Sequence, residues 1–448
     1  MRNKKYKKLR LVFVLLPCLV CVLAVAVLLP GSGSRGAAGG AGGSDQLEAA
    51  GGAGGSDQLE AAGGAGESDQ LEAAGGEGQP GSVGDVGQPE SGVGSMEETE
   101  PEAATEITLV MVGDVLLHTR VAESGRKEDG GYDFSAVFAH VKEEIEAADL
   151  ALVNQEVIIG GEELGVTGYP SFNAPYELGG ALADTGFDVV LHATNHALDK
   201  GKRGILNCLA FWEENYPEMA VLGIHQSQAR QEEIYIYEQE GIKVAVLNYT
   251  YGTNGIALPG DMPYAVDLLE KDRMSRDLQK AREEADFVIV CPHWGTEYSL
   301  EASKSQKDLA AWFAEKGADL VLGTHPHVIE PIEILDGEEE EGTLVYYSLG
   351  NFVNWTSGTG QGVANRMVGG MARITIGLNE AGRAVVKDYG VEPLICHVET
   401  GVGGVTVYPL EEYTEELASR NEICLQDGSF SLEYCRNLVE EVFGARVY

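Results

Sequence analysis

The sequence predicts an α/β protein with a largely buried sheet, and two observations support that prediction. From residue 107 on, short apolar runs of β type alternate with amphipathic stretches of helical period. The runs are almost continuously apolar, which is typical of strands covered on both faces. The chain has 448 residues, so that one large domain of this kind remains after its first quarter is set aside.

The first 30 residues predict a membrane anchor. Residues 1–10 carry six basic residues and no acidic one, and an almost unbroken apolar run extends from Leu11 to Pro30. About 20 apolar residues in a helix span a hydrocarbon core, and a basic flank stays in the cytoplasm. We therefore expect a cytoplasmic flank (1–10), a single-pass transmembrane signal-anchor helix (11–30) and an extracytoplasmic C-terminal domain. A cleaved signal peptide is the alternative, although the run is longer than a usual signal-peptide core and no small-x-small site follows it.

Residues 31–105 predict a linker. The unit GGAGGSDQLEAA occurs three times from Gly39 to Ala74, with Glu67 in place of a glycine in the third copy. Each unit holds one leucine, which buries too little apolar surface to offset the entropy of ordering the chain. We expect a disordered stalk that separates the membrane from the working domain.

The working domain is expected over residues 106–355, followed by a C-terminal β extension and helical tail (356–448). Predicted strands lie at 107–114, 150–156, 187–196, 243–251, 286–295, 319–327 and 344–352. Helical patterns lie at 134–148, 202–215, 268–285 and 303–316. In the extension we expect a hairpin turning at residues 379–382, and the acidic run at 337–341 predicts a solvated turn.

Charge and cysteine content argue against a nucleic-acid-binding protein and against a small disulfide-stabilised protein. The chain holds 31 basic and 71 acidic residues. Without the six basic residues at its start, the remainder carries a formal charge of about −46, which argues against a nucleic-acid partner. Five cysteines lie beyond the apolar segment, and an odd number so widely spaced predicts no disulfide framework. An oxidising compartment would still allow Cys424 and Cys435 to pair.

One stretch, from Asp319 to Val328, points to chemistry. Its apolar strand leads into His325 and His327, which are separated by Pro326. Strand residues i and i+2 face the same side, so both imidazoles can aim at one point, and the proline limits the entropy lost on binding a ligand. An isolated pair of this kind is as consistent with chance as with a metal site. The residues at the other strand ends distinguish the two explanations.

Almost every predicted core strand ends in side chains able to bind a metal or assist hydrolysis. In an open α/β sheet the carboxyl ends of the strands gather along one edge, where ligands bind. A single histidine at a strand end is more often structural, but five such strand ends favour a metal or catalytic cleft. The residues are Asp114, Asn154, Glu156, Asn195, His196, His293, His325 and His327.

This ligand set indicates the kind of ion. Carboxylate, amide and imidazole ligands favour a borderline or hard divalent ion such as Mn²⁺, Fe²⁺ or Zn²⁺, and we expect one or two ions. A carboxylate that bridges two ions holds them about 3.5–4 Å apart, and the pair activates a water for attack on a phosphorus or carbonyl centre. His196, next to the expected ligand Asn195, would then protonate the leaving group.

Six motifs, in this order, resemble those of the bacterial capsule synthesis proteins of the CapA family. They are GD (113–114), VNQE (153–156), ATNHALDKG (193–201), CPHWGTEY (291–298), GTHPHVIEPIE (323–333) and YYSLGNFV (346–353). The resemblance covers residues 106–355 and implies a role in poly-γ-glutamate capsule production. It also implies a four-layered α/β/β/α sandwich similar to the calcineurin-like metallophosphoesterases.

The resemblance to metallophosphoesterases implies ligand roles for individual residues. Asp114 matches their metal ligand on the first strand, and Glu156 stands near the position of their bridging aspartate. The remaining motif positions are matched by Asn195, His196, His293, His325 and His327. The resemblance therefore implies the same cleft as the strand ends.

The sequence departs from the metallophosphoesterase pattern at two places, which reduces the number of metal ligands that the resemblance implies. Leu116 stands where those enzymes place a histidine, and the nearest substitute is His118. VNQE replaces their second motif, which leaves both Asn154 and Glu156 as candidate ligands. Two further residues, Glu297 and Asn351, either line the cleft or serve the local backbone.

Two kinds of function follow. The first is a metal-dependent hydrolase or transferase acting on a phosphoester or a γ-glutamyl amide, in capsule synthesis or on another envelope substrate. The second is non-enzymatic, with the same cleft binding polymer or a membrane subunit of the capsule machinery during assembly and export. So acidic a domain would repel poly-γ-glutamate unless cations or a basic patch intervene, although salt screens this beyond about 8–10 Å.

Overall fold

The structure is a computed structural model, and it describes residues 105–335, 342–401 and 403–448. The predicted cytoplasmic flank, membrane anchor and stalk lie outside the described residues, as does the predicted turn at 337–341. Within the described ranges, no helix has both the length and the apolar character needed to span a membrane.

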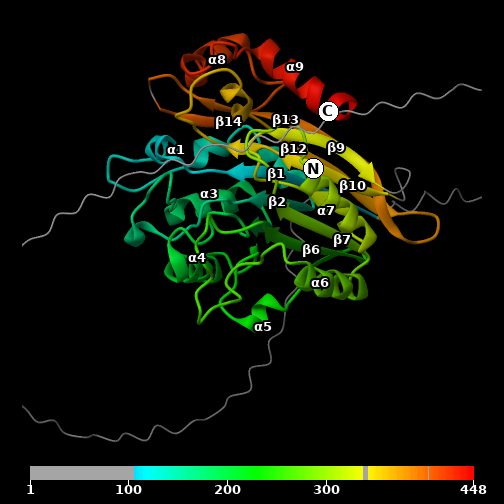
Figure 1. Ribbon diagram of the computed structural model, residues 1–448. Coiled ribbons are helices and arrows are strands. Elements are labelled where there is room, and N and C mark those ends of the chain that lie inside the picture. The colour runs from blue at the N-terminus through cyan, green and yellow to red at the C-terminus, as the bar shows by residue number, and fades with distance from the viewer. Residues whose placement is uncertain (1–104, 336–341, 402) are drawn as a thin grey trace, which may run out of the picture. The chain divides into compact units, whose positions relative to one another are not determined.

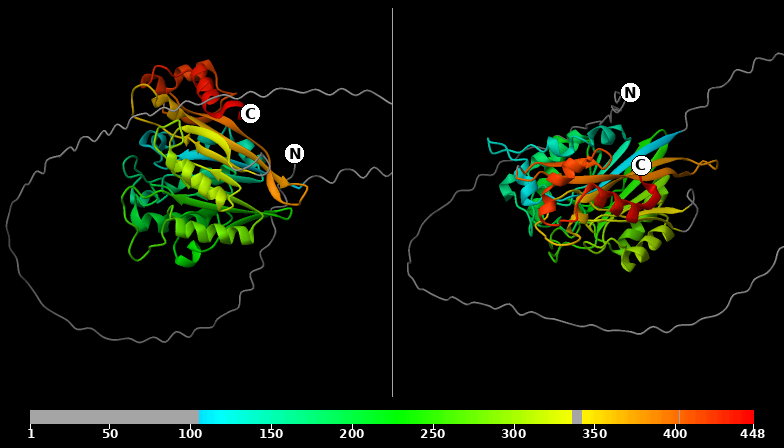
Figure 2. Two further views of the ribbon diagram at one scale, coloured as in Figure 1. Left: turned by 45° about the vertical axis from the view of Figure 1, so that its right-hand side comes forward. Right: turned by 90° about the horizontal axis from the view of Figure 1, so that it is seen from above.

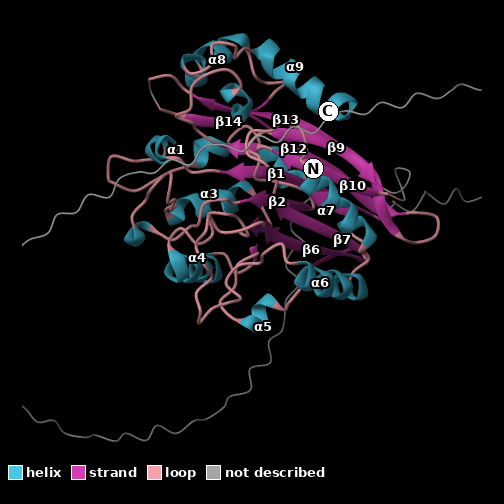
Figure 3. Ribbon diagram, in the orientation of Figure 1, coloured by secondary structure: helices cyan, strands magenta, loops and turns pink. Residues whose placement is uncertain are grey.

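Two β sheets form the centre of the described chain (Figures 1 and 3). The strands are β1 (Glu106–Val115), β2 (Leu150–Asn154), β3 (Val189–Leu191), β4 (Ala220–Leu222), β5 (Tyr235–Gln239), β6 (Ile242–Thr250), β7 (Phe287–His293), β8 (Leu320–Leu322), β9 (Ile329–Leu335), β10 (Thr343–Leu349), β11 (Asn351–Val353), β12 (Val368–Leu378), β13 (Ala384–Val398) and β14 (Val405–Pro409). The first sheet has the order β14-β13-β12-β1-β2-β3-β4, and β11 pairs with β1 beside this path. The second has the order β5-β6-β7-β8-β10-β9.

The centre of each sheet is parallel. Strands β1 to β4 run parallel in the first sheet, and β6, β7, β8 and β10 in the second. Antiparallel strands flank them, with β12, β13 and β14 beyond β1, β5 beside β6, and β9 beside β10. Each of the seven predicted runs contains a strand, and the predicted hairpin at 379–382 joins β12 to β13, so both predictions are confirmed.

Helices pack against these sheets (Figures 1 and 2). They are α1 (Thr119–Ser124), α2 (Lys142–Ala147), α3 (Tyr176–Thr185), α4 (Gly201–Asn215), α5 (Gln228–Gln231), α6 (Lys271–Glu284), α7 (Lys304–Glu315), α8 (Glu415–Arg420) and α9 (Leu432–Phe443). Short 3₁₀ helices are η2 (Ser135–Phe138), η3 (Glu162–Leu164), η4 (Val363–Met367), η5 (Glu422–Leu425) and η6 (Gly444–Arg446). Three of the predicted helices are confirmed as α4, α6 and α7, and α8 and α9 confirm the helical tail.

The predicted helix at 134–148 is wrong as a single element. The segment forms η2 and the short helix α2 instead. Phe138, Val141 and Ile145 are nevertheless buried. The helical period therefore marked which residues face the core, and it did not require one continuous helix.

The second sheet divides its side chains between two cores. Alternate residues such as Val244, Val246 and Ile289 join the core shared with the first sheet. Their neighbours, including Ala245 and Val288, pack with α6 and α7 on the other face. Because strand side chains alternate between faces, this division shows a sheet covered on both sides. The predicted α/β fold is confirmed as a sandwich of two sheets with helices against it.

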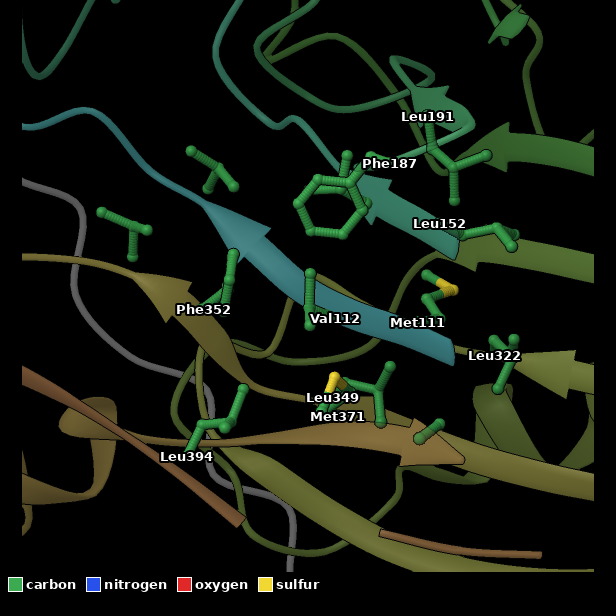
Figure 4. Packing of buried hydrophobic residues seen from close by; sticks show 14 of the residues in the cluster. Met111, Val112, Leu152, Phe187, Leu191, Leu322, Leu349, Phe352, Met371 and Leu394 are labelled. Atoms are coloured by element: carbon green, nitrogen blue, oxygen red, sulfur yellow. The ribbon is translucent and has the colours of Figure 1, made fainter. Parts of the chain in front are cut away.

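The core between the sheets is apolar. Figure 4 shows Met111 and Leu152 of the first sheet close to Leu322 of the second. The thiol of Cys291 lies 4.0 Å from Met111 Sδ. All five cysteines of the described ranges are free thiols, including Cys424 and Cys435, which were candidates for a disulfide.

Candidate metal centre

The predicted site residues come from both sheets. In the first sheet, Asp114 lies near the end of β1, Asn154 ends β2, and the Asn195-His196 pair follows β3. In the second sheet, His293 ends β7, and His325 follows β8. The carboxyl ends of parallel strands from two sheets thus meet. The strand-end pattern predicted the edge of one open sheet, whereas the family resemblance implied a sandwich of two sheets.

The GD and LGN motifs bring β1 and β11 together at the site. The backbone N–H of Asp114 donates to the Gly350 carbonyl at 3.0 Å, and Asp114 pairs in register with Asn351. A Cβ added to Gly113 would lie 1.9 Å from the Gly350 oxygen. Gly350 itself has a φ of 64°, which favours glycine. Both glycines are therefore required for the backbone to place Asp114.

His325 and His327 reach the site in a way that the strand pattern did not predict. Strand β8 ends at Leu322, and the two histidines have φ values of 101° and 60°. The expectation that they alternate along an extended strand is therefore wrong. Left-handed backbone at residues other than glycine costs about 1–3 kcal/mol each and persists where the surroundings enforce it, often at functional sites. Here the His325 N–H donates to Asp114 Oδ2 at 3.2 Å.

We use the name metal-ligand cluster for five buried candidate ligands, which are Asp114, Glu156, His293, His325 and His327. Their potential ligand atoms form two groups in which all atoms lie within 4.8 Å of one another. One group is Asp114, Glu156 and His327, and the other is Glu156, His293 and His325. Glu156 belongs to both groups, as a carboxylate that bridges two ions would.

Glu156 provides the test of whether these residues fit a cation. Both of its carboxylate oxygens are buried and, among the described residues, accept no hydrogen bond. Oε1 lies 3.9 Å from His293 Nε2, and Oε2 lies 3.7 Å from His327 Nδ1, which are too long for hydrogen bonds. Burying a carboxylate without a partner is costly, and a coordinated metal supplies the missing charge. The donor set therefore fits a divalent ion.

Without an ion, the buried carboxylates and imidazoles of the cluster shift one another's pKa values. Burial, together with the nearby Asp114 carboxylate, raises the pKa of Glu156 well above its usual value. Burial acts to lower the pKa of His327, but the Glu156 and Asp114 carboxylates outweigh it and raise that pKa to about 9. Burial and neighbouring imidazoles lower the pKa of His293 well below its usual value and that of His325 to about 3. His293 and His325 are thus neutral, as metal ligands must be.

His196 lies beside the cluster. Its Nε2 is 3.9 Å from Glu156 Oε1, and its Nδ1 is 2.7 Å from Asp199 Oδ2. Asp199 therefore fixes the orientation of the ring. Sequence reasoning missed Asp199, although it stands within the ATNHALDKG motif, three residues after His196.

Amide side chains surround the ligands. Asn195 Oδ1 lies 2.9 Å from His293 Nε2. Asn154 Nδ2 donates to Asp114 Oδ1 at 2.8 Å, whereas its own Oδ1 is buried and has no partner among the described residues. Asn351 Oδ1 lies 3.1 Å from His327 Nδ1. Asn154 and Asn351 thus position ligands in this structure.

Two other candidates lie at the edge. Glu297 is exposed and forms a third possible ligand group with His325 and His327. His118 is in none of the ligand groups of the described chain, and its ring packs against Phe172 at a centroid distance of 5.1 Å. Burial and the nearby His327 and His196 lower its pKa to about 4. His118 therefore lies outside the ligand groups of the described chain.

A comparison with protein families identifies the chain. The model of the family described as "Bacterial capsule synthesis protein PGA_cap" matches residues 108–356, more than half of the chain. The chain belongs to this family. The match spans all six motifs and every residue of the metal-ligand cluster, so the cluster lies in the part of the chain that the family shares.

Similar curated proteins carry related names. "PGA biosynthesis protein CapA" from Bacillus subtilis is 33% identical over 39% of this chain and 45% of the relative. "Capsule biosynthesis protein CapA" from Bacillus anthracis is 29% identical over 56% of this chain and 61% of the relative. The chain thus spans about half to three fifths of these relatives. Among solved structures, NAD nucleotidase from Haemophilus influenzae aligns at 12% identity and a TM-score of 0.41, covering 77% of this chain and 64% of that one.

Proposed function

We propose that this chain works at the cell envelope in poly-γ-glutamate capsule synthesis, as a metal-dependent hydrolase or transferase with a four-layered metallophosphoesterase-like domain. Family membership supports the capsule role. The names of two similar proteins, both called CapA, point the same way. The substrate class proposed is the γ-glutamyl amide of the polymer or a phosphoester of an envelope intermediate.

The proposed metal-dependent chemistry rests mainly on the state of Glu156. A buried carboxylate without a hydrogen-bond partner in the described chain, shared between two groups of ligand atoms, is what a two-ion centre requires. Bound divalent ions, of Mn²⁺, Fe²⁺ or Zn²⁺ type, supply a Lewis acid and an activated water. Asp114, His293, His325 and His327 would hold them together with Glu156.

His196 has the position of a proton donor. Its Nδ1 is held by Asp199 at 2.7 Å, which leaves Nε2 facing the ligand cluster. A proton at Nε2 can pass to the leaving group, while Asp199 holds the ring in position. The ring of Phe172 packs edge-on against His196 at a centroid distance of 4.6 Å.

A turnover assay tests the proposal. The metal-loaded full-length chain is expected to cleave poly-γ-glutamate, or else a phosphodiester, and Asp114→Asn is expected to abolish that activity. The control is Asp308→Asn, because Asp308 is exposed on α7 and contacts only Lys304 in the described structure. Equal turnover by wild type and Asp114→Asn would contradict the proposal.

One observation favours a second, non-enzymatic function. Position 116 carries a buried leucine, and among the described residues His118 does not join the ligand groups in its place. The group of Asp114, Glu156 and His327 is therefore short of one imidazole compared with the metallophosphoesterase pattern. A chain that binds metal and polymer but turns over neither substrate would be a binding or assembly subunit of the capsule machinery.

The remaining parts of the proposal concern location and partners. The apolar segment at 11–30 is proposed to anchor the chain in the cell membrane, with the working domain outside. The proposed partners are the envelope polymer and membrane subunits of capsule synthesis. Protease protection of the C-terminal region in inside-out vesicles, with digestion in intact protoplasts, is the expected outcome.

A further inference from the structure

Arg366, in η4, lies next to the metal-ligand cluster. Its carbonyl oxygen accepts a hydrogen bond from Asn351 Nδ2 at 2.9 Å, and Oδ1 of the same amide lies 3.1 Å from His327 Nδ1. Its guanidinium carbon is 3.5 Å from the centroid of the Tyr298 ring, and that centroid is 5.9 Å from the His327 ring. The backbone of Arg366 is thus linked to His327 through Asn351, and the ring beneath its guanidinium lies next to His327.

The guanidinium of Arg366 has no anionic partner among the residues that the structure describes. Its Nη1 donates to Thr356 Oγ1 at 2.9 Å, whereas its Nε is buried and donates to no described atom. Arg120 differs because it forms an ion pair with Glu422 at 2.5 Å. Arginine carries five N–H donors and remains charged, so most of the capacity of Arg366 is unused.

The orientation of this side chain suits an oxyanion. A guanidinium stacked on an aromatic ring exposes its donors only in its own plane, where two parallel N–H groups match the two oxygens of a carboxylate or a phosphate. Nε is buried and one N–H of Nη1 donates to Thr356, which leaves Nη2 and the second N–H of Nη1, at the tip of the side chain, for a ligand. Tyr298 is 46% exposed and Arg366 is half-buried, so the stacked pair lies where the site meets solvent.

The residues around the site carry mostly negative charge, which makes an arginine without an anionic partner in the described chain significant. The exposed Glu297 and the buried Asp114 and Glu156 make the surroundings acidic, in a chain with a formal charge of −40. An anionic substrate therefore needs a positive contact close to the metal ligands.

We propose that Arg366, stacked on Tyr298, is the substrate-binding residue that holds an oxyanion next to the bond to be cut. The oxyanion is either a carboxylate, such as that of a γ-linked glutamate unit, or a phosphate group. The inference rests on the proposed function, because it names the substrate class of the same centre. Its role is to bind and orient, and Arg366 is not a metal ligand.

Binding measurements on the full-length, metal-loaded chain test this proposal. The variants are Arg366→Gln, Arg366→Lys and, as a matched control for loss of one charge, Arg230→Gln, whose side chain is 63% exposed on α5. The probes are γ-glutamyl-glutamate for the carboxylate and inorganic phosphate for the phosphate, titrated by calorimetry. Substitution of the side chain leaves the backbone contact to Asn351 in place, and thermal unfolding with metal content verifies that each variant is folded and loaded.

Wild type is expected to bind at least one probe. Arg366→Gln should weaken that binding at least about tenfold, and Arg366→Lys by a smaller factor, since lysine keeps the charge and loses the paired donors. Arg230→Gln should bind as wild type, and metal content should not change in any variant. The probe that is weakened identifies the source of the oxyanion.

Two results would overturn the inference. One is that Arg366→Gln binds both probes as tightly as wild type, and the other is that wild type binds neither. Failure of the proposed function gives a different pattern, in which the oxyanion still binds through Arg366 but no substrate turns over. A folded chain without metal would likewise reject the metal-dependent function, and the binding of both probes would be compared in that metal-free state.

Discussion

Two histidine–carboxylate clusters in this chain differ in how their polar atoms are satisfied. In the His397 cluster, which comprises His397, Glu399, Tyr413 and Arg420, every partner is in place. His397 contacts Tyr413 Oη at 2.9 Å and Glu399 Oε2 at 3.1 Å, and Arg420 donates to both oxygens of Glu399. Hydrogen bonds from Arg420, and then from His397, lower the pKa of Glu399 to about 2.

The metal-ligand cluster shows the opposite pattern. Glu156 is fully buried, neither of its oxygens accepts a hydrogen bond from the described chain, and its pKa is raised by burial. Both clusters combine imidazole with carboxylate, so residue type alone does not separate a structural cluster from a site. Unsatisfied polar atoms at a place where several strands end do separate them, because such atoms require a partner that the chain does not supply.

The largest expected effect concerns turnover. His196→Ala should lower the turnover number of an active chain about 10²–10⁴-fold, because it removes the proton donor and leaves the metal ligands in place. His397→Ala should leave turnover unchanged. Steady-state kinetics with metal content measured in parallel distinguish the two. Equal losses in both variants would mean that the two clusters do not differ in the way described.

A smaller effect is expected on metal affinity as pH changes. The pKa of His327 is raised to about 9 without metal, so its proton stabilises the metal-free fold below the ordinary value near 6.5, and that stabilisation is lost as pH rises through about 9. Metal binding must displace this proton. Apparent affinity for a divalent ion should therefore rise up to roughly tenfold per pH unit between about 6.5 and 9.

Calorimetric titration of the metal-stripped chain at three pH values within this range measures the dependence. His397→Ala should keep the same slope, since the His397 cluster holds no metal. An affinity that stays constant across the range would show that His327 binds no proton that the metal must displace.

The smallest expected effect concerns stability without metal. In the stripped chain, Glu156→Gln should raise the free energy of unfolding by about 1–3 kcal/mol, because a neutral amide replaces an unsatisfied buried carboxylate. Glu399→Gln should lower it by no more than about 1 kcal/mol, since that ion pair is near the surface. Urea denaturation measures both. A loss of stability in Glu156→Gln would indicate that the chain itself already satisfies this carboxylate.

The fold was largely predictable because its central strands are parallel and buried. Continuous apolar runs mark such strands directly, and all seven runs contain one. The apolar pattern alone did not show that the runs divide into two sheets, since pairing depends on contacts between distant segments; only the family resemblance implied it. The short strand β4 was also missed, because its three residues are half-buried and carry no distinctive pattern.

The site was predictable only in part. Polar residues after apolar runs marked Asp114, Glu156 and His293, which the structure brings together. Left-handed backbone at His325 and His327 has no signature in sequence, because histidine only rarely adopts it. Arg366 lies outside every strand-end motif, and only tertiary packing places it beside Tyr298.

The most direct test of the central claim is the metal content of the full-length chain. Elemental mass spectrometry of the purified protein should find one or two divalent transition-metal ions per chain, and Glu156→Gln should lose them while Glu399→Gln retains them. Restoring the ion to stripped wild type should also raise its thermal unfolding temperature. A folded wild-type chain that contains no metal, and whose unfolding temperature does not respond to added Mn²⁺, Fe²⁺ or Zn²⁺, would contradict the account.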